Sequence, residues 1–127
     1  WPCTFIFIDN SEGVKTIDAF GIKCIPGDLI ISGGQNKIDL KGLSNITSIY
    51  GSLIIKSNQK LRNLTGLASL TYVGGTLLIE NNDRLTDIKS LSNLKYVGKG
   101  ITIINNPSLD DSTPRCYLNN LNMKLEY

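Results

Sequence analysis

Apolar residues return at a fixed interval along most of the chain. Gly51 and Gly75 each precede a Gly-x-Leu-x-Ile pattern, and Gly27 opens the related segment Gly27-Asp28-Leu29-Ile30-Ile31. The step from Gly27 to Gly51 equals the step from Gly51 to Gly75, and we call this step the repeat interval. Counting by it brings segments 4–8, 28–32, 52–56, 76–80 and 100–104 into one frame. A fixed translation is typical of stacked repeats, because each repeat places its apolar side chains over those of its neighbour.

Within each segment apolar residues alternate with other residues at the period of two expected for a β-strand. This predicts one parallel sheet with two inward columns, Phe5-Leu29-Leu53-Leu77-Ile101 and Phe7-Ile31-Ile55-Ile79-Ile103. Between the strands apolar residues recur every third position, with glycines among them, which favours corners and short strands over a long α-helix. We therefore expect an all-β solenoid, a right-handed β-helix of about five leucine-rich coils.

The two ends of such a stack need covers for their exposed core. Segment 11–21 predicts a short capping helix, with Ser11 as N-cap, Val14 and Ile17 on one face and Gly21 as the stop. Near the other end, Tyr117, Leu118, Leu121 and Met123 offer apolar cover. We expect a single domain over 1–127: an N-terminal strand and cap at 1–26, regular coils at 27–109 and a C-terminal cap at 110–127.

Asparagines recur where the predicted strands end. Asn10, Asn58, Asn82 and Asn106 each fall three residues after the second inward residue of a strand. A stacked Asn amide can both donate to and accept from the backbone of neighbouring coils. The column therefore predicts a structural ladder and not a catalytic site.

A further column, with one residue from each strand, is predicted to face outward and to be partly apolar. It contains Ile6, Ile30, Ile54, Leu78 and Thr102, with Lys56, Glu80 and Ile104 among its flanking residues. Soluble monomers seldom leave a continuous aliphatic row in water, and an apolar strip with a polar rim is typical of protein interfaces. We predict a binding face here; the alternative is that the C-terminal tail or a neighbouring domain covers it.

Several motifs together resemble a known family. Cys24-x-x-Gly27-Asp28-Leu29-Ile30-Ile31, Ile49-Tyr50-Gly51-Ser52-Leu53-Ile54-Ile55, Asn105-Asn106-Pro107-Ser108-Leu109 and Cys116-Tyr117-Leu118 are similar to receptor L domains. These are leucine-rich ectodomain modules of the insulin and epidermal growth factor receptors, with a related form in lipid-anchored fungal cell-wall proteins. The resemblance implies a non-catalytic extracellular domain, secreted or attached to the cell surface, and names no ligand.

The three cysteines predict disulfide chemistry, because the chain has no His and too few ligands for a zinc site. A Cys3–Cys24 bond would tie the capping helix to the first strand and contribute about 3 kcal/mol by the loop-entropy estimate. Cys116 then pairs with a cysteine beyond residues 1–127 or in another chain, or it stays a buried thiol. Asn45-Ile46-Thr47 and Asn63-Leu64-Thr65 match the N-glycosylation sequon, which also arises by chance.

The composition argues against catalysis and several partner classes. Without His, a Ser-His-Asp or Cys-His arrangement is excluded, and Asp110-Asp111 is the only adjacent acidic pair. We expect no enzyme activity, metal or cofactor. The net charge of +2 comes without a basic block, so we expect no nucleic acid partner. No apolar run reaches the roughly 20 residues of a membrane span, so we expect no membrane insertion in this segment.

Two non-enzymatic functions remain. The first is a recognition or adhesion module that binds a protein or glycan through its parallel-sheet face. The second is a structural, self-assembling subunit of a cell wall, sheath or extracellular filament, since head-to-tail contacts need not close.

Overall fold

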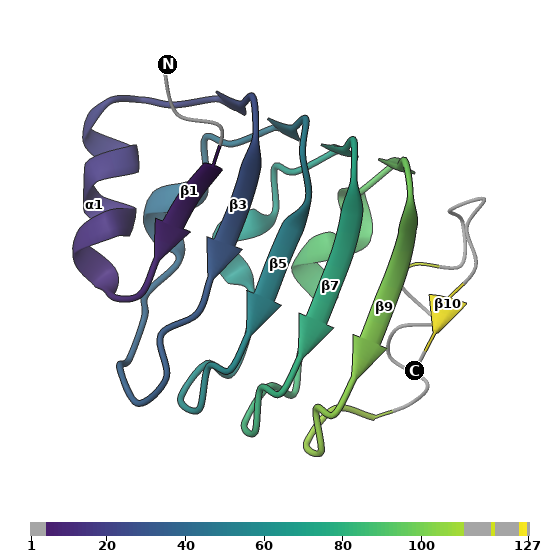
Figure 1. Ribbon diagram of the computed structural model, residues 1–127. Coiled ribbons are helices and arrows are strands. Elements are labelled where there is room, and N and C mark those ends of the chain that lie inside the picture. The colour runs from purple at the N-terminus through teal and green to yellow at the C-terminus, as the bar shows by residue number, and fades with distance from the viewer. Residues whose placement is uncertain (1–4, 111–117, 119–124, 127) are drawn as a thin grey trace.

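Two parallel sheets extend along the stack of repeats (Figure 1). The computed structural model describes residues 5–110, Leu118 and Leu125–Glu126. The larger sheet contains β1 (Phe5–Ile8), β3 (Asp28–Ile31), β5 (Leu53–Lys56), β7 (Thr76–Glu80), β9 (Gly100–Ile104) and β10 (Leu125–Glu126), in that order. The smaller sheet contains β2 (Cys24–Ile25), β4 (Ser48–Ile49), β6 (Tyr72–Val73) and β8 (Tyr96–Val97).

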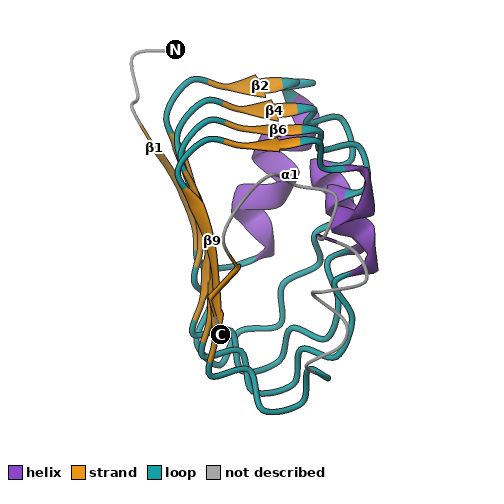
Figure 2. Ribbon diagram, turned by 90° about the vertical axis from the view of Figure 1, so that its right-hand side faces the viewer, coloured by secondary structure: helices purple, strands orange, loops and turns teal. Residues whose placement is uncertain are grey.

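The helices are α1 (Ser11–Ala19) and the 3₁₀ helices η1 (Lys41–Leu43), η2 (Thr65–Leu67) and η3 (Lys89–Asn93). The 3₁₀ helices face the larger sheet across the core (Figure 2), and α1 lies at the end of the stack beside β1 (Figure 1). The arrangement is mixed α/β, so the expectation of an all-β solenoid is wrong. The spacing of three between Leu64, Leu67 and Leu70 has a simple cause, because η2 lies within this stretch and a 3₁₀ helix has three residues per turn.

The repeat interval sets the register of the larger sheet from β3 to β9. Leu29 pairs with Leu53, Leu53 with Leu77 and Leu77 with Ile101, all in parallel strands. The Ile31, Ile55, Ile79 and Ile103 column keeps the same register, and all four side chains are buried. The prediction that five strands form one parallel sheet is confirmed for the described residues, and β10 adds a sixth, parallel to β9.

The first strand departs from that register by one residue. Phe7 pairs with Ile30 and Ile8 with Ile31, so Ile8 occupies the inward position and is fully buried. Phe7 is 51% exposed, and Ile6, which pairs with Leu29, packs partly buried against the core. Placing Phe7 in an inward column and Ile6 on the outward face was therefore wrong, and Phe5 pairs with Asp28 and not with Leu29. All four residues of β1 are apolar, so a period of two could not tell its faces apart.

Helix α1 covers the core at the first end of the stack. Its Val14 and Ile17 are buried, as the spacing predicted. The N-cap is Asn10 and not Ser11, because the Asn10 side chain accepts a hydrogen bond from the Glu12 N–H at 2.9 Å. Gly21 follows the helix with φ of +60°, a conformation that glycine adopts readily. At the other end Leu118 is buried, and Tyr117, Leu121 and Met123 lie outside the described residues.

Candidate binding surface

The outer face of the larger sheet carries an aliphatic stripe, which we define as Ile30, Ile54 and Leu78. The three residues are paired in register on β3, β5 and β7, and Thr102 continues the column on β9. Each of these side chains is partly exposed, whereas its strand neighbours on either side are buried. Figures 1 and 2 show the other described helices and strands behind this sheet or beside it, so none of them covers the stripe.

Polar and charged residues border the stripe along the ends of the strands. Lys56 pairs in register with Glu80, and Glu80 with Ile104. Lys56 is exposed, and the other two are partly exposed. On β1 the residue in register with the stripe is Phe7, so the predicted face gains an exposed aromatic ring and loses Ile6. The result is a flat apolar strip with a mixed polar margin, as found at protein interfaces.

At the start of the strands, side chains accept backbone hydrogen bonds from the next repeat. Asp28 Oδ1 accepts from the Ser52 N–H at 2.7 Å, and Ser52 Oγ accepts from the Thr76 N–H at 2.9 Å. These polar residues belong to the scaffold as well as to the margin of the face. Their bonds fix the spacing of the strands that present the stripe.

At the far end of the strands, Asn58, Asn82 and Asn106 form an asparagine ladder. Asn58 Nδ2 donates to Asn82 Oδ1, and Asn82 Nδ2 donates to Asn106 Oδ1, both at 2.9 Å. All three are buried, and each also donates to a strand carbonyl of the preceding repeat, namely that of Ile31, Ile55 or Ile79. Asn10 is not a member, because it is exposed and caps α1. The ladder is thus structural and holds the lower edge of the face.

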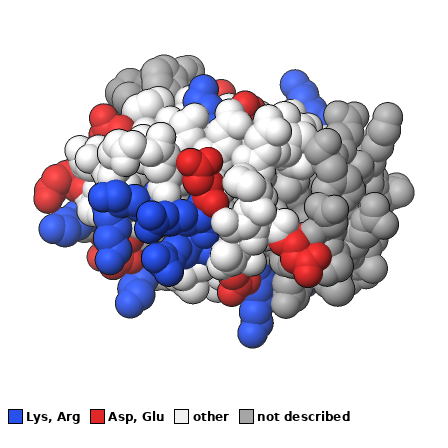
Figure 3. Space-filling view, turned by 90° about the horizontal axis from the view of Figure 1, so that it is seen from below, with Lys and Arg blue, Asp and Glu red and all other residues white. Residues whose placement is uncertain are grey.

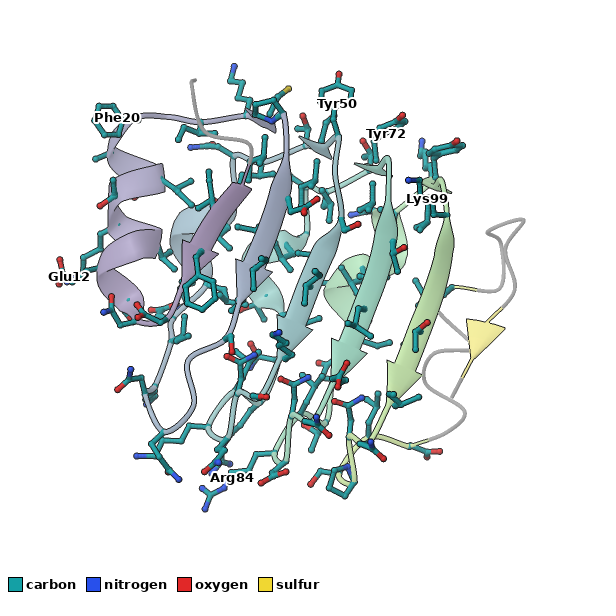
Figure 4. All side chains as sticks on the ribbon, viewed as in Figure 1. Glu12, Phe20, Tyr50, Tyr72, Arg84 and Lys99 are labelled. Carbon is teal, nitrogen blue, oxygen red and sulfur yellow. The ribbon has the colours of Figure 1, made fainter. Side chains whose placement is uncertain are left out.

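A row of tyrosines on the smaller sheet was not predicted as a site. Tyr72 and Tyr96 are paired in register, and their rings stack with centroids 4.9 Å apart, while Tyr50 tilts against Tyr72 at 5.4 Å. Figure 4 shows Tyr50 and Tyr72 at the upper edge of the molecule. The signal was present in the sequence as two tyrosines separated by one repeat interval. Cross-strand stacking of this kind stabilises a sheet.

The predicted modification sites lie away from the stripe. Asn45 and Asn63 are exposed, and both belong to the side of the molecule that carries the 3₁₀ helices. Asn63 Oδ1 accepts from the Thr65 hydroxyl at 3.2 Å. Cys24 is exposed and unbonded among the described residues, whereas Cys3 and Cys116 lie outside them. The Cys3–Cys24 bond and the glycans stay predictions.

The described residues hold no group of three or more His, Cys, Asp and Glu side chains suited to a metal ion. Within the same part of the chain, every buried side-chain nitrogen and oxygen has a hydrogen-bond partner. The polar groups of the interior therefore serve the scaffold.

Comparison with protein families agrees with this geometry. The family model described as receptor L domain matches residues 23–123, and the chain belongs to this family. Receptor L domains are non-enzymatic, ligand-binding modules, typically of extracellular ectodomains. No curated protein and no solved structure matches the chain. None of the helices in the described part is long and apolar enough to span a membrane.

Proposed function

We propose that the chain is an extracellular recognition module that binds a protein or glycan partner through the outer face of its larger sheet. The observation that carries the proposal is the aliphatic stripe, which strand register aligns on the outer face of the sheet and which no other described helix or strand covers. Membership in a family of ligand-binding modules supports it.

The geometry favours recognition over end-to-end assembly. At the first end, α1 packs Val14 and Ile17 into the core and occupies the position that a stacked copy would need. At the other end, β10 pairs with β9 along its outer edge. A filament subunit that propagates through its ends would leave those ends open, whereas a recognition module presents a face and closes its ends.

The test compares two neighbouring isoleucines of β5. Ile54→Asp places a charge at the centre of the stripe and should abolish partner binding with little effect on folding, because Ile54 is partly exposed. Ile55→Asp places a carboxylate between Ile31 and Ile79 in the core and should cost several kcal/mol of unfolding free energy. Circular dichroism and urea unfolding measure the difference.

Binding is read out with a library of displayed extracellular proteins and a glycan array, probed with the wild-type chain, Ile54→Asp and Ser69→Asp. Ser69 is exposed near η2, on the opposite side of the core, and its variant adds the same charge. A ligand retained by Ser69→Asp and lost by Ile54→Asp supports the proposal. If Ile54→Asp unfolds the chain as severely as Ile55→Asp, or if light scattering shows open-ended association, the recognition face is wrong.

A further inference from the structure

A column of basic residues lies below the ends of the strands. In three successive repeats the residue just before a buried aliphatic side chain is a cation: Lys37 before Ile38, Lys60 before Leu61 and Arg84 before Leu85. Arg62 follows Leu61 on the same corner. We call Lys37, Lys60, Arg62 and Arg84 the basic column, and all four are exposed.

Backbone contacts hold these positions over one another. Gly34 pairs in parallel with Asn58, and Asn63 with Asp87, so the corner between them stays in register from repeat to repeat. Lys60 and Arg84 are separated by one repeat interval within this corner. In addition, the Thr86 N–H donates to the Arg62 carbonyl at 3.0 Å. The backbones of Lys60 and Arg84 therefore lie about 5 Å apart, the separation of paired strands.

Lys37 departs from the repeat interval by one residue. By strict counting it matches Leu61, which is 5% exposed, but in this repeat the buried side chain of the corner is that of Ile38, at 6% exposure. Lys37 itself is exposed, on the same corner of the repeat as Lys60 and Arg84. A hydrogen bond holds the corner next to Lys37, because Asn36 Nδ2 donates to the Asp9 carbonyl at 2.9 Å.

The column lacks ion-pair partners in the described part of the chain, where the one salt bridge joins Lys15 to Glu12. Acidic residues also occur on this corner: Asp39, Asp83 and Asp87 are the nearest in sequence, and Asp9 adjoins it through its backbone carbonyl. Asp39 and Asp87 accept backbone hydrogen bonds from the residues that begin η1 and η3. Figure 3 shows Lys and Arg side chains gathered on this lower face, towards the α1 end, and Figure 4 places Arg84 at its edge.

Like charges stacked in register reduce stability, so scaffold requirements do not explain the column. We propose that it binds an acidic polysaccharide, a sugar chain that carries carboxylate or sulfate groups. Cations about 5 Å apart suit a chain with a charge on every ring. An extended acidic peptide fits less well, because its side chains alternate and carboxylates on one side are about 7 Å apart. Exposed amides of Gln35 and Gln59 adjoin the column and can bind sugar hydroxyls.

The experiment uses heparin and polygalacturonate as probes, with neutral dextran, polyglutamate and an oligodeoxynucleotide for comparison. One variant combines Lys37→Gln, Lys60→Gln, Arg62→Gln and Arg84→Gln. Its matched control combines Lys23→Gln, Lys41→Gln, Lys95→Gln and Lys99→Gln, four exposed lysines outside the column, and changes the net charge equally. Affinity is measured by calorimetry over a salt series, and folding by thermal unfolding.

We expect the column variant to lose affinity for one or both acidic polysaccharides about tenfold or more, and the control to lose much less, because four aligned contacts act together. An equal loss of affinity in both variants would show that only the net charge of the protein matters, and it would overturn the proposal. Tighter column-dependent binding of polyglutamate or the oligodeoxynucleotide would overturn the partner class. If the column variant does not fold, acetylation of lysines in the wild-type chain tests the proposal instead. The bound acidic polysaccharide must then protect Lys37 and Lys60 from acetylation and leave Lys95 and Lys99 reactive.

Discussion

Asn82, the central member of the asparagine ladder, offers the sharpest test of what holds the repeats in register. Its side chain is fully buried. Nδ2 donates to the Ile55 carbonyl at 3.1 Å and to Asn106 Oδ1 at 2.9 Å. Oδ1 accepts from the backbone N–H of Asn58 at 3.2 Å and from Asn58 Nδ2 at 2.9 Å. Asn82→Ala removes all four hydrogen bonds and leaves the space of the amide group empty.

The cost follows from the groups left behind. The Asn58 N–H and the Ile55 carbonyl lose this partner in a buried place, and each unsatisfied group costs about 1–3 kcal/mol. The side chains of Asn58 and Asn106 retain other bonds, to the Ile31 and Ile79 carbonyls. We therefore expect Asn82→Ala to lower the free energy of unfolding by about 2–6 kcal/mol, a large part of the roughly 5–15 kcal/mol of a typical domain.

Asn82→Asp separates hydrogen bonding from side-chain volume. The carboxylate keeps the acceptor for Asn58 and almost the same shape, but it turns an oxygen towards the Ile55 carbonyl and Asn106 Oδ1. Burying a charge against two acceptors is unfavourable, so this variant should be at least as unstable as Asn82→Ala at neutral pH.

Urea unfolding followed by circular dichroism measures both variants, with the m-value as the check on two-state behaviour. Asn93→Ala is the matched control, because Asn93 is exposed and its Nδ2 donates to the Ala68 carbonyl at 2.7 Å, a bond that water can replace. We expect it to cost under about 1 kcal/mol. A loss at Asn82→Ala no larger than that of the control would refute the structural role of the ladder.

Two further predictions concern the scaffold. A Cβ at Gly66 would overlap the Leu40 backbone carbonyl, so Gly66→Ala should lower the free energy of unfolding by several kcal/mol. Gly21 has open space around it, so Gly21→Ala should lower it only by the roughly 1–2 kcal/mol that a positive φ costs an alanine. Thermal unfolding of the two variants measures the difference. For the cysteines, we expect peptide mapping without reduction to link Cys3 to Cys24, and a link from the third cysteine to either one would contradict this pairing.

Much of the larger sheet could be predicted from one translation of the sequence. From β3 to β9 the repeats have equal length, so counting by the repeat interval gives both register and face. The method fails at β1, where α1 intervenes and the step from Ile8 to its partner Ile31 is one residue shorter than the repeat interval. There the fit to the core decides: Ile8 lies against Gly13 of α1, and the bulkier Phe7 stays outside. Asn10 follows the same shift and serves the helix.

The helical content and the smaller sheet were harder to foresee. Each of β2, β4, β6 and β8 has two residues, which is too short for a period of two to be visible. The 3₁₀ helices have three to five residues and little propensity signal of their own. Their positions follow from packing, since Leu43, Leu67 and Leu91 reach the core from within these turns. A leucine pattern alone did not separate such turns from corners between strands.

The basic column is not visible as a charged block in the sequence, for a related reason. Lys60 and Arg84 are one repeat interval apart, Lys37 precedes Lys60 by one residue less, and Arg62 lies two residues beyond Lys60, so no window of the sequence contains a basic run. Stacking converts that interval into neighbouring positions about 5 Å apart. Charge in a protein of stacked repeats must therefore be counted along each column, because a partner meets the column and not the sequence window. The aliphatic stripe arises in the same way, so one translation of the sequence builds two separate surfaces, an apolar face and a basic lower edge.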